Sequence, residues 1–93
     1  MGEDSIKGKN IEIVARDIAE GYIFVSPIFL KRFEREALKK LLAAIMKTMT
    51  LVRNERFPTG DVEAIKKRNL QLSRLNNAST VMKNFAKERR WII

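Results

Sequence analysis

Apolar side chains recur every three or four residues along the chain from Pro27 to Arg53. At 100° per residue they cover about half of a helix circumference, whereas an ordinary surface helix needs an apolar stripe of roughly 100°. The residues on this side are Leu30, Phe33, Ala37, Leu38, Leu41, Ala44, Ile45, Met49 and Val52. We therefore predict one long helix over residues 27–53, which forms the centre of a helical bundle or the seam of an oligomer.

The preceding residues predict a shorter amphipathic helix over residues 11–20. One face carries Ile11, Val14, Ala15 and Ile18, and the opposite face is charged. Gly21 is a typical stop for this helix, and Ser26-Pro27 is a typical start for the next one. Between them, residues 22–25 favour an extended segment that has no partner strand in the chain. Residues 1–10 are expected to be a flexible leader, and residues 11–93 a single helical domain.

Beyond Arg53, Phe57-Pro58-Thr59-Gly60-Asp61 predicts a loop, because Pro58 interrupts any helix. In the final segment, Val62, Ile65 and Leu72 point one way, and Leu75, Met82 and Phe85 point about 120° away. Because a straight helix keeps its apolar stripe in line, we predict two helices, over residues 61–75 and 79–90, with a turn at Asn76-Asn77. A single bent helix is the alternative. The expected fold class is all-α: a small three- to four-helix bundle with a long central helix. We expect it to form a homo-oligomer, of which the dimer is the commonest kind.

The 93 residues include no cysteine and no histidine. This composition excludes disulfides and thiolate chemistry, and it removes most zinc sites and the commonest general base. Glu34 and Glu36 are two residues apart, so a helix splays them instead of pairing them. We therefore expect no enzyme activity, no cofactor and no metal. The absence of an apolar run of roughly 20 residues predicts a cytoplasmic protein without a membrane span.

Positive charge is concentrated at the end of the chain. The net charge is +8, and residues 62–93 hold eight lysines and arginines against two glutamates. Because such an excess favours a polyanionic partner, we predict nucleic-acid binding through phosphate contacts. The candidate residues are Lys66, Lys67, Arg74, Lys83, Lys87, Arg89 and Arg90, with Arg32, Arg35 and Lys39 as an extension. The helical spacing groups them into two stripes, Lys67/Arg74 and Lys83/Lys87/Arg90.

About 20 residues around Asn76-Asn77 loosely resemble a helix-turn-helix, which would make Ser79, Thr80, Lys83 and Asn84 base-reading candidates. A plain helical hairpin is the alternative. The second functional hypothesis is a helical adaptor whose basic face docks an acidic protein partner.

The aromatic and methionine side chains are expected in the core: Phe24, Phe29, Phe33, Met46, Met49 and Met82. Trp91 is expected to fold back onto the bundle or to pack against a second subunit.

Overall fold

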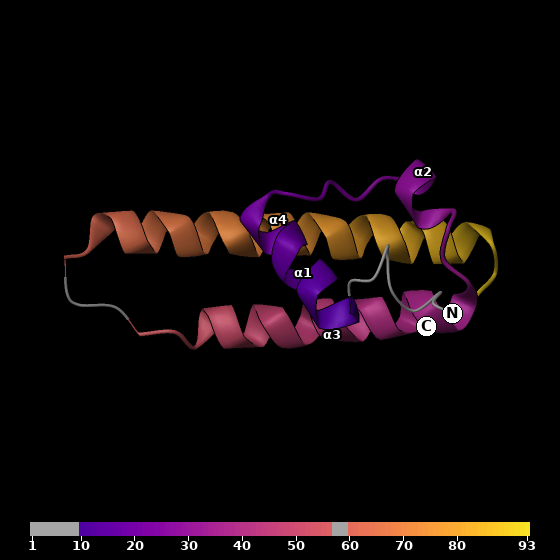
Figure 1. Ribbon diagram of the computed structural model, residues 1–93, viewed down its shortest axis with the longest axis horizontal. Helices are drawn as coiled ribbons and strands as arrows, with labels where there is room; N and C mark the ends of the chain where they lie inside the picture. Colours follow the sequence, from indigo (N-terminus) through magenta and orange to yellow (C-terminus); the bar gives the residue numbers. More distant parts are fainter. Residues whose placement is uncertain (1–9, 57–59) are drawn as a thin grey trace.

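A long antiparallel hairpin of two helices forms the frame of the molecule. The computed structural model describes residues 10–56 and 60–93, which form four helices and their connections without any strand. The helices are α1 (Ile11–Glu20), α2 (Pro27–Leu30), α3 (Arg35–Arg53) and α4 (Val62–Glu88). In Figure 1, α3 and α4 run side by side along the longest dimension of a 44 × 27 × 19 Å molecule, and α1 packs across both. The predicted all-α class is confirmed; residues 1–9 of the predicted leader and 57–59 of the predicted loop lie outside the described residues.

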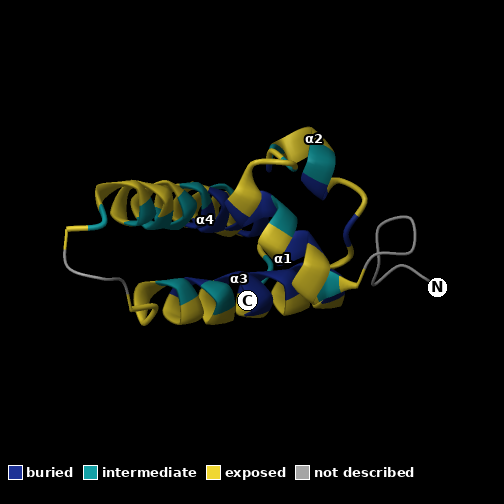
Figure 2. Ribbon diagram, turned by 60° about the vertical axis from the view of Figure 1, so that its left-hand side comes forward, coloured by how far each residue is buried: buried dark blue, intermediate teal, exposed yellow. Residues whose placement is uncertain are grey.

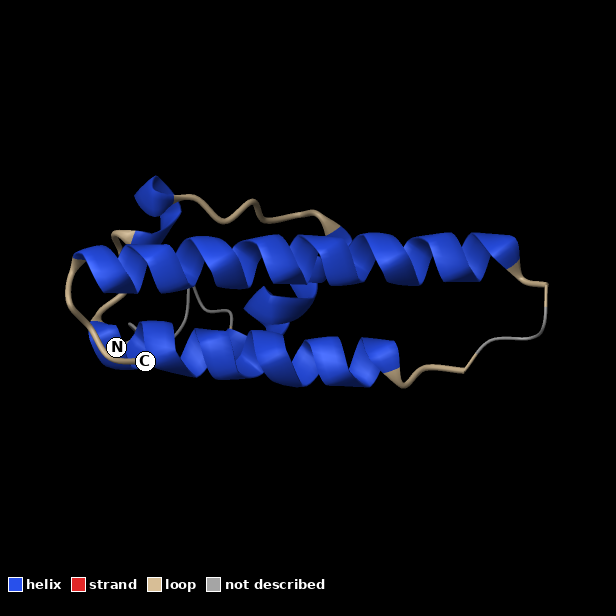
Figure 3. Cartoon of the chain, turned by 180° about the vertical axis from the view of Figure 1, so that it is seen from behind, coloured by secondary structure: helices blue, strands red, loops and turns tan. Residues whose placement is uncertain are grey.

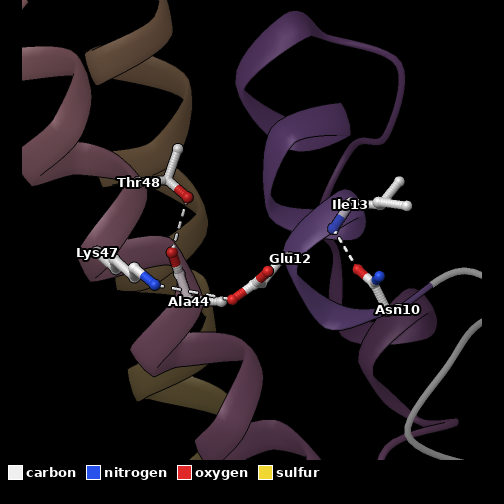
Figure 4. Close-up of polar contacts among 6 residues, drawn as sticks. All are labelled: Asn10, Glu12, Ile13, Ala44, Lys47 and Thr48. Atoms are coloured by element: carbon white, nitrogen blue, oxygen red, sulfur yellow. Dashed lines mark hydrogen bonds and ion pairs between the residues drawn. The ribbon is translucent and has the colours of Figure 1, made fainter.

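The bounds of α1 are those that the sequence predicts. At its beginning, the Asn10 side-chain oxygen accepts a 2.8 Å hydrogen bond from the Ile13 N–H (Figure 4). At its end, Gly21 adopts the left-handed conformation with φ 88°. The N–H groups of Gly21 and Tyr22 donate to the carbonyls of Ile18 and Asp17, which is the Schellman motif. Local signals at both ends therefore define this helix.

The prediction of a single helix over residues 27–53 is wrong, because the helix is interrupted between Leu30 and Arg35. The predicted start is confirmed, since the Ser26 hydroxyl accepts a hydrogen bond from the Phe29 N–H. Four residues later the helix stops, and extended backbone at Glu34 begins α3. No glycine or proline marks this break. Instead, the short α2 packs against α4 while α3 packs against α1 and α4, so the break lets both segments bury their apolar sides.

The two helices predicted for the final segment are also wrong, since α4 is continuous over 27 residues, about 40 Å. The hydroxyls that could cap a new helix instead bond within the existing one: Ser79 and Thr80 both donate to the Asn76 carbonyl, at 2.8 and 3.1 Å. On the inner side, Leu75, Ala78 and Met82 are buried in one unbroken row. This packing outweighs the poor helix propensity of the two asparagines.

All four helices contribute to one core, whose most buried large side chains are Leu30, Leu38, Leu41, Ile45, Leu75, Met82 and Val14. The apolar side predicted for residues 27–53 is buried as expected, with Val52 only partly covered. The expectation for Phe24 and Met46 is wrong, because both are exposed. Figure 2 shows the core where α1, α3 and α4 meet, and an exposed far end of α4. This exposed end explains why the apolar residues of the final segment point in two directions. Val62 and Ile65 extend beyond the core and are 56% and 38% exposed.

Candidate nucleic-acid interface

The continuity of α4 fixes where its basic side chains lie. At 100° per residue, Lys67 and Arg74 fall on one side and Lys83 and Lys87 on the nearly opposite side. Lys67 and Lys83 are also about 24 Å apart along the axis. The two predicted stripes therefore do not form one surface, and Lys66 lies with Lys67 in the far half of the helix.

Arg74 is used by the fold. Its guanidinium donates a 3.0 Å hydrogen bond to the carbonyl of Ala19, in the last turn of α1. There it meets the negative end of the helix dipole. A Cβ on Gly21 would lie only 2.8 Å from the Arg74 Cζ, so a larger residue there would displace the guanidinium, while the positive φ of 88° is what favours glycine at this position. Arg74 thus joins α4 to the end of α1 and is the least available of the predicted phosphate ligands.

Lys83, Lys87 and Arg90 come together at the other end of α4. All three are exposed, and they line a cavity of about 320 Å³. The other lining residues are Ala86, Trp91, Ile92 and Ile93, so no carboxylate side chain is among them. We call the set Lys83, Lys87, Arg90 and Trp91 the cationic cavity. In Figures 1 and 3 the chain end leaves α4 here and turns back beside α3.

A Schellman motif without glycine forms one wall of the cationic cavity. The N–H groups of Arg90 and Trp91 donate to the carbonyls of Lys87 and Ala86, at 3.0 and 2.8 Å. Arg90 occupies the left-handed position with φ 60°, the position that Gly21 takes at the end of α1. For a residue with a Cβ this conformation costs about 1–2 kcal/mol. Backbone strain of this kind tends to persist at functional sites.

Aromatic contacts hold the end of the chain in place. Trp91 packs edge-on against Phe85 with ring centroids 6.0 Å apart, which confirms that it folds back onto the helices and their core. The Arg89 guanidinium lies 3.8 Å from the Phe85 ring centroid and 5.8 Å from that of Trp91. Arg89 therefore covers these rings and makes cation–π contacts. Its charge adds to the field at this end of the molecule.

The predicted extension on the preceding segment is mostly engaged in local contacts. Arg32 lies 5.4 Å from the centroid of the Phe29 ring. Arg35 forms a 3.1 Å ion pair with Glu36, and both side chains are more than half exposed, so the pair contributes little to stability. Lys39 is exposed on α3. None of these three residues lines the cationic cavity.

The side of α4 that faces away from the core carries uncharged polar side chains. The prediction of two separate helices does not group these residues on one surface. Between Lys66 and Lys87 the exposed residues on this side are Asn69, Ser73, Asn76, Asn77, Thr80, Lys83 and Asn84, and the half-exposed Leu70 borders it beside Asn77. The two carboxylates of α4, Glu63 and Glu88, stand at its ends. Ser79 faces inward and is buried. The helix-turn-helix interpretation is therefore wrong: no turn is present, and Ser79 is inaccessible to a ligand.

Other polar contacts connect α1 to its neighbours. Lys47 Nζ lies 3.8 Å from a Glu12 carboxylate oxygen and joins α3 to α1 (Figure 4). In the part of the chain that the structure describes, no three acidic side chains converge as a metal site would require. Over the same residues, no helix has both the length and the apolar composition needed to cross a membrane.

Comparisons with known proteins give no relative: no family model, curated protein or solved structure matches this chain.

Proposed function

We propose that this protein binds nucleic acid and that the cationic cavity makes the primary phosphate contacts. The observation that carries the proposal is the convergence of Lys83, Lys87 and Arg90 around one cavity without a lining carboxylate side chain. Lys83 and Lys87 are one turn apart, about 6 Å along the axis, and Arg90 lies just beyond the end of α4 at the same cavity. The two lysines alone span the rise of about two nucleotides at 3.4 Å each.

The chemistry of the cationic cavity suits a nucleotide chain. Lysine ammonium groups neutralise phosphates as mobile point charges, and the arginine fork can bind two phosphate oxygens at once. Trp91 adds an aromatic surface beside these cations, and bases stack on such surfaces. Phosphate contacts therefore provide the affinity, and stacking favours strands with accessible bases.

The outer side of α4 favours nucleic acid over an acidic protein partner. Protein interfaces have apolar, aromatic centres. This side of the helix instead presents amides and hydroxyls, including Asn76, Thr80 and Asn84, beside the lysines. Such groups hydrogen-bond to phosphates, sugars and base edges. The net charge alone is compatible with either a nucleic acid or an acidic protein. The amides are the feature that favours nucleic acid.

The only tryptophan of the chain lies in the proposed site, so its fluorescence reports binding without a label. The experiment titrates the protein with a 20-nucleotide single strand and with the matching duplex, over a series of salt concentrations. We expect quenching and an apparent binding constant that falls linearly with salt on logarithmic axes. The double variant Lys83→Gln/Lys87→Gln should lower the magnitude of that slope by about 2. The matched control is Lys66→Gln/Lys67→Gln, which removes the same charge from the far half of α4.

Equal losses in the two double variants would contradict the assignment to the cationic cavity and leave only non-specific attraction to a basic protein. Binding that does not change with salt, or no binding of either oligonucleotide, would reject the function itself. In that case polyglutamate, tested in the same titration, distinguishes an adaptor for acidic proteins from a chain that binds neither polyanion.

A further inference from the structure

One segment of this highly charged chain has no charge at all. No charged residue occurs between Gly21 and Leu30. Three of its apolar side chains nevertheless face solvent: Tyr22, Phe24 and Ile28 are 78%, 86% and 76% exposed. We call Tyr22, Phe24 and Ile28 the apolar patch. Single exposed apolar side chains are ordinary, but three of this size within residues 22–28, on the connection and the start of α2, are typical of an interaction surface.

Neighbouring side chains of this connection differ in burial. After the Schellman motif at the end of α1, the chain bends at Tyr22 and Ile23 and then reaches the Ser26 cap of α2 without helix or strand. Ile23 and Val25 pack against the core, whereas Tyr22 and Phe24 are exposed. The core contacts of Ile23 and Val25 therefore leave the Phe24 ring between them in solvent.

A cavity of about 430 Å³ lies beside Phe24. Its walls are mostly apolar and come from α1, the connection to α2, and α4: Ile18, Ile23, Val25, Ala78 and Val81, together with the exposed Phe24. Arg74 and Asn77 provide polar atoms in the same wall. Apolar cavities on the order of 150 Å³ already hold a benzene ring. A phenyl ring from outside the chain therefore fits here.

We propose that the occupant is a second copy of this chain, with Phe24 of each copy inserted into the cavity of the other. A two-fold dimer requires a self-complementary patch, and here the projecting ring and the cavity that accepts it lie side by side. The connection that carries the apolar patch has no charge, and the only charged side chain among the described residues of the cavity wall, Arg74, is hydrogen-bonded to the Ala19 carbonyl, so two copies of charge +8 can approach here with few like charges between them. The broad apolar side of α3 cannot form the dimer interface, because α1 and α4 already bury it.

The test measures dimerisation by analytical ultracentrifugation of nuclease-treated protein in 0.5 M salt, where bridging by nucleic acid is suppressed. We expect a dimer that persists at this salt concentration. Phe24→Ser should raise the dimer dissociation constant by about 100-fold or more, since two phenyl rings lose their burial. The matched control is Leu51→Ser, which replaces an exposed apolar side chain elsewhere, on α3. It should leave the dimer dissociation constant unchanged.

A mixing experiment tests the reciprocal insertion. Val81→Trp should fill the cavity while keeping Phe24, so this variant alone should also be monomeric. Mixed with Phe24→Ser, whose cavity keeps every wall residue except Phe24 itself, it offers one ring to one open cavity, and we expect heterodimers to form more readily than either homodimer. Circular dichroism confirms that each variant is folded. A monomeric wild type, a dimer insensitive to Phe24→Ser, or a mixture no better than its components would overturn the proposal, whether or not the protein binds nucleic acid.

Discussion

Replacing Arg90 by glycine should make the protein more stable and a weaker ligand for nucleic acid. Arg90 holds the left-handed position of the Schellman motif that ends α4, with φ 60°. Glycine adopts this conformation without a steric penalty, as Gly21 does at the end of α1. The same substitution removes one of the three cations that line the cationic cavity. Stability and affinity should therefore move in opposite directions.

The stability gain follows from two opposing terms. Relief of the left-handed arginine contributes about 1–2 kcal/mol. Glycine also makes the unfolded chain more flexible, which offsets about 0.4–1 kcal/mol of that gain. The two ranges leave a net increase of about 0–1.6 kcal/mol in the free energy of unfolding, centred near about 0.8 kcal/mol, which corresponds to a rise of roughly 3–6 °C in Tm for a domain of this size. For binding, the loss of one phosphate contact lowers the magnitude of the logarithmic salt slope by about 1 and the affinity by roughly tenfold near 0.1 M salt.

Urea denaturation and the tryptophan titration measure the two effects in the same samples. Arg90→Ala separates them, because alanine lacks the charge but keeps the strain, so its affinity should fall without a gain in stability. Lys47→Gln is a control for net charge, since it removes one cation from the exposed pair with Glu12. A glycine variant no more stable than wild type would refute the strain argument. Undiminished affinity would refute the place of Arg90 in the interface.

Three further variants test the fold around the site. Gly21→Ala should destabilise the protein by about 1–2 kcal/mol in urea denaturation, because alanine is strained at φ 88°, and its Cβ should also displace the Arg74 guanidinium; unchanged stability would contradict the strain at this position. Arg74→Ala should lower the free energy of unfolding by about 1–2 kcal/mol through loss of the bond to the Ala19 carbonyl, while the salt slope of binding stays the same; a lower slope would place Arg74 among the phosphate ligands. Asn76→Ala should raise stability by about 0.5 kcal/mol if α4 is continuous, whereas a turn at this position would make the substitution destabilising.

Where local chemistry sets a boundary, the sequence predicts it. The extent of α1 follows from the spacing of its charged and apolar residues, and its end follows from Gly21. The start of α2 follows from Ser26-Pro27. The break between Leu30 and Arg35 has no such local cause. It depends on how α2 and α3 divide the surfaces of α4 and α1, and that information is distributed over residues distant in sequence.

The last helix shows the opposite error, in which local signals are present but inactive. Ser79 has the side chain of an N-cap, yet its hydroxyl donates to the Asn76 carbonyl within α4. The motif that ends this helix is missed for a related reason, because arginine occupies the position where glycine normally announces it. The apolar pair Phe85 and Trp91 was the usable signal, since a Schellman motif commonly brings such residues together.

The geometry of α4 also determines how the two proposals combine. Val81 and Ala78, in the wall of the larger cavity, lie on nearly the opposite side of the helix from Lys83 and Lys87. A second copy seated on the apolar patch would therefore leave both cationic cavities facing outward. Each dimer would then offer two phosphate sites on one rigid body, and a strand long enough to reach both would gain affinity from its effective concentration at the second site. A short oligonucleotide would gain nothing, because only one cavity at a time lies within its reach.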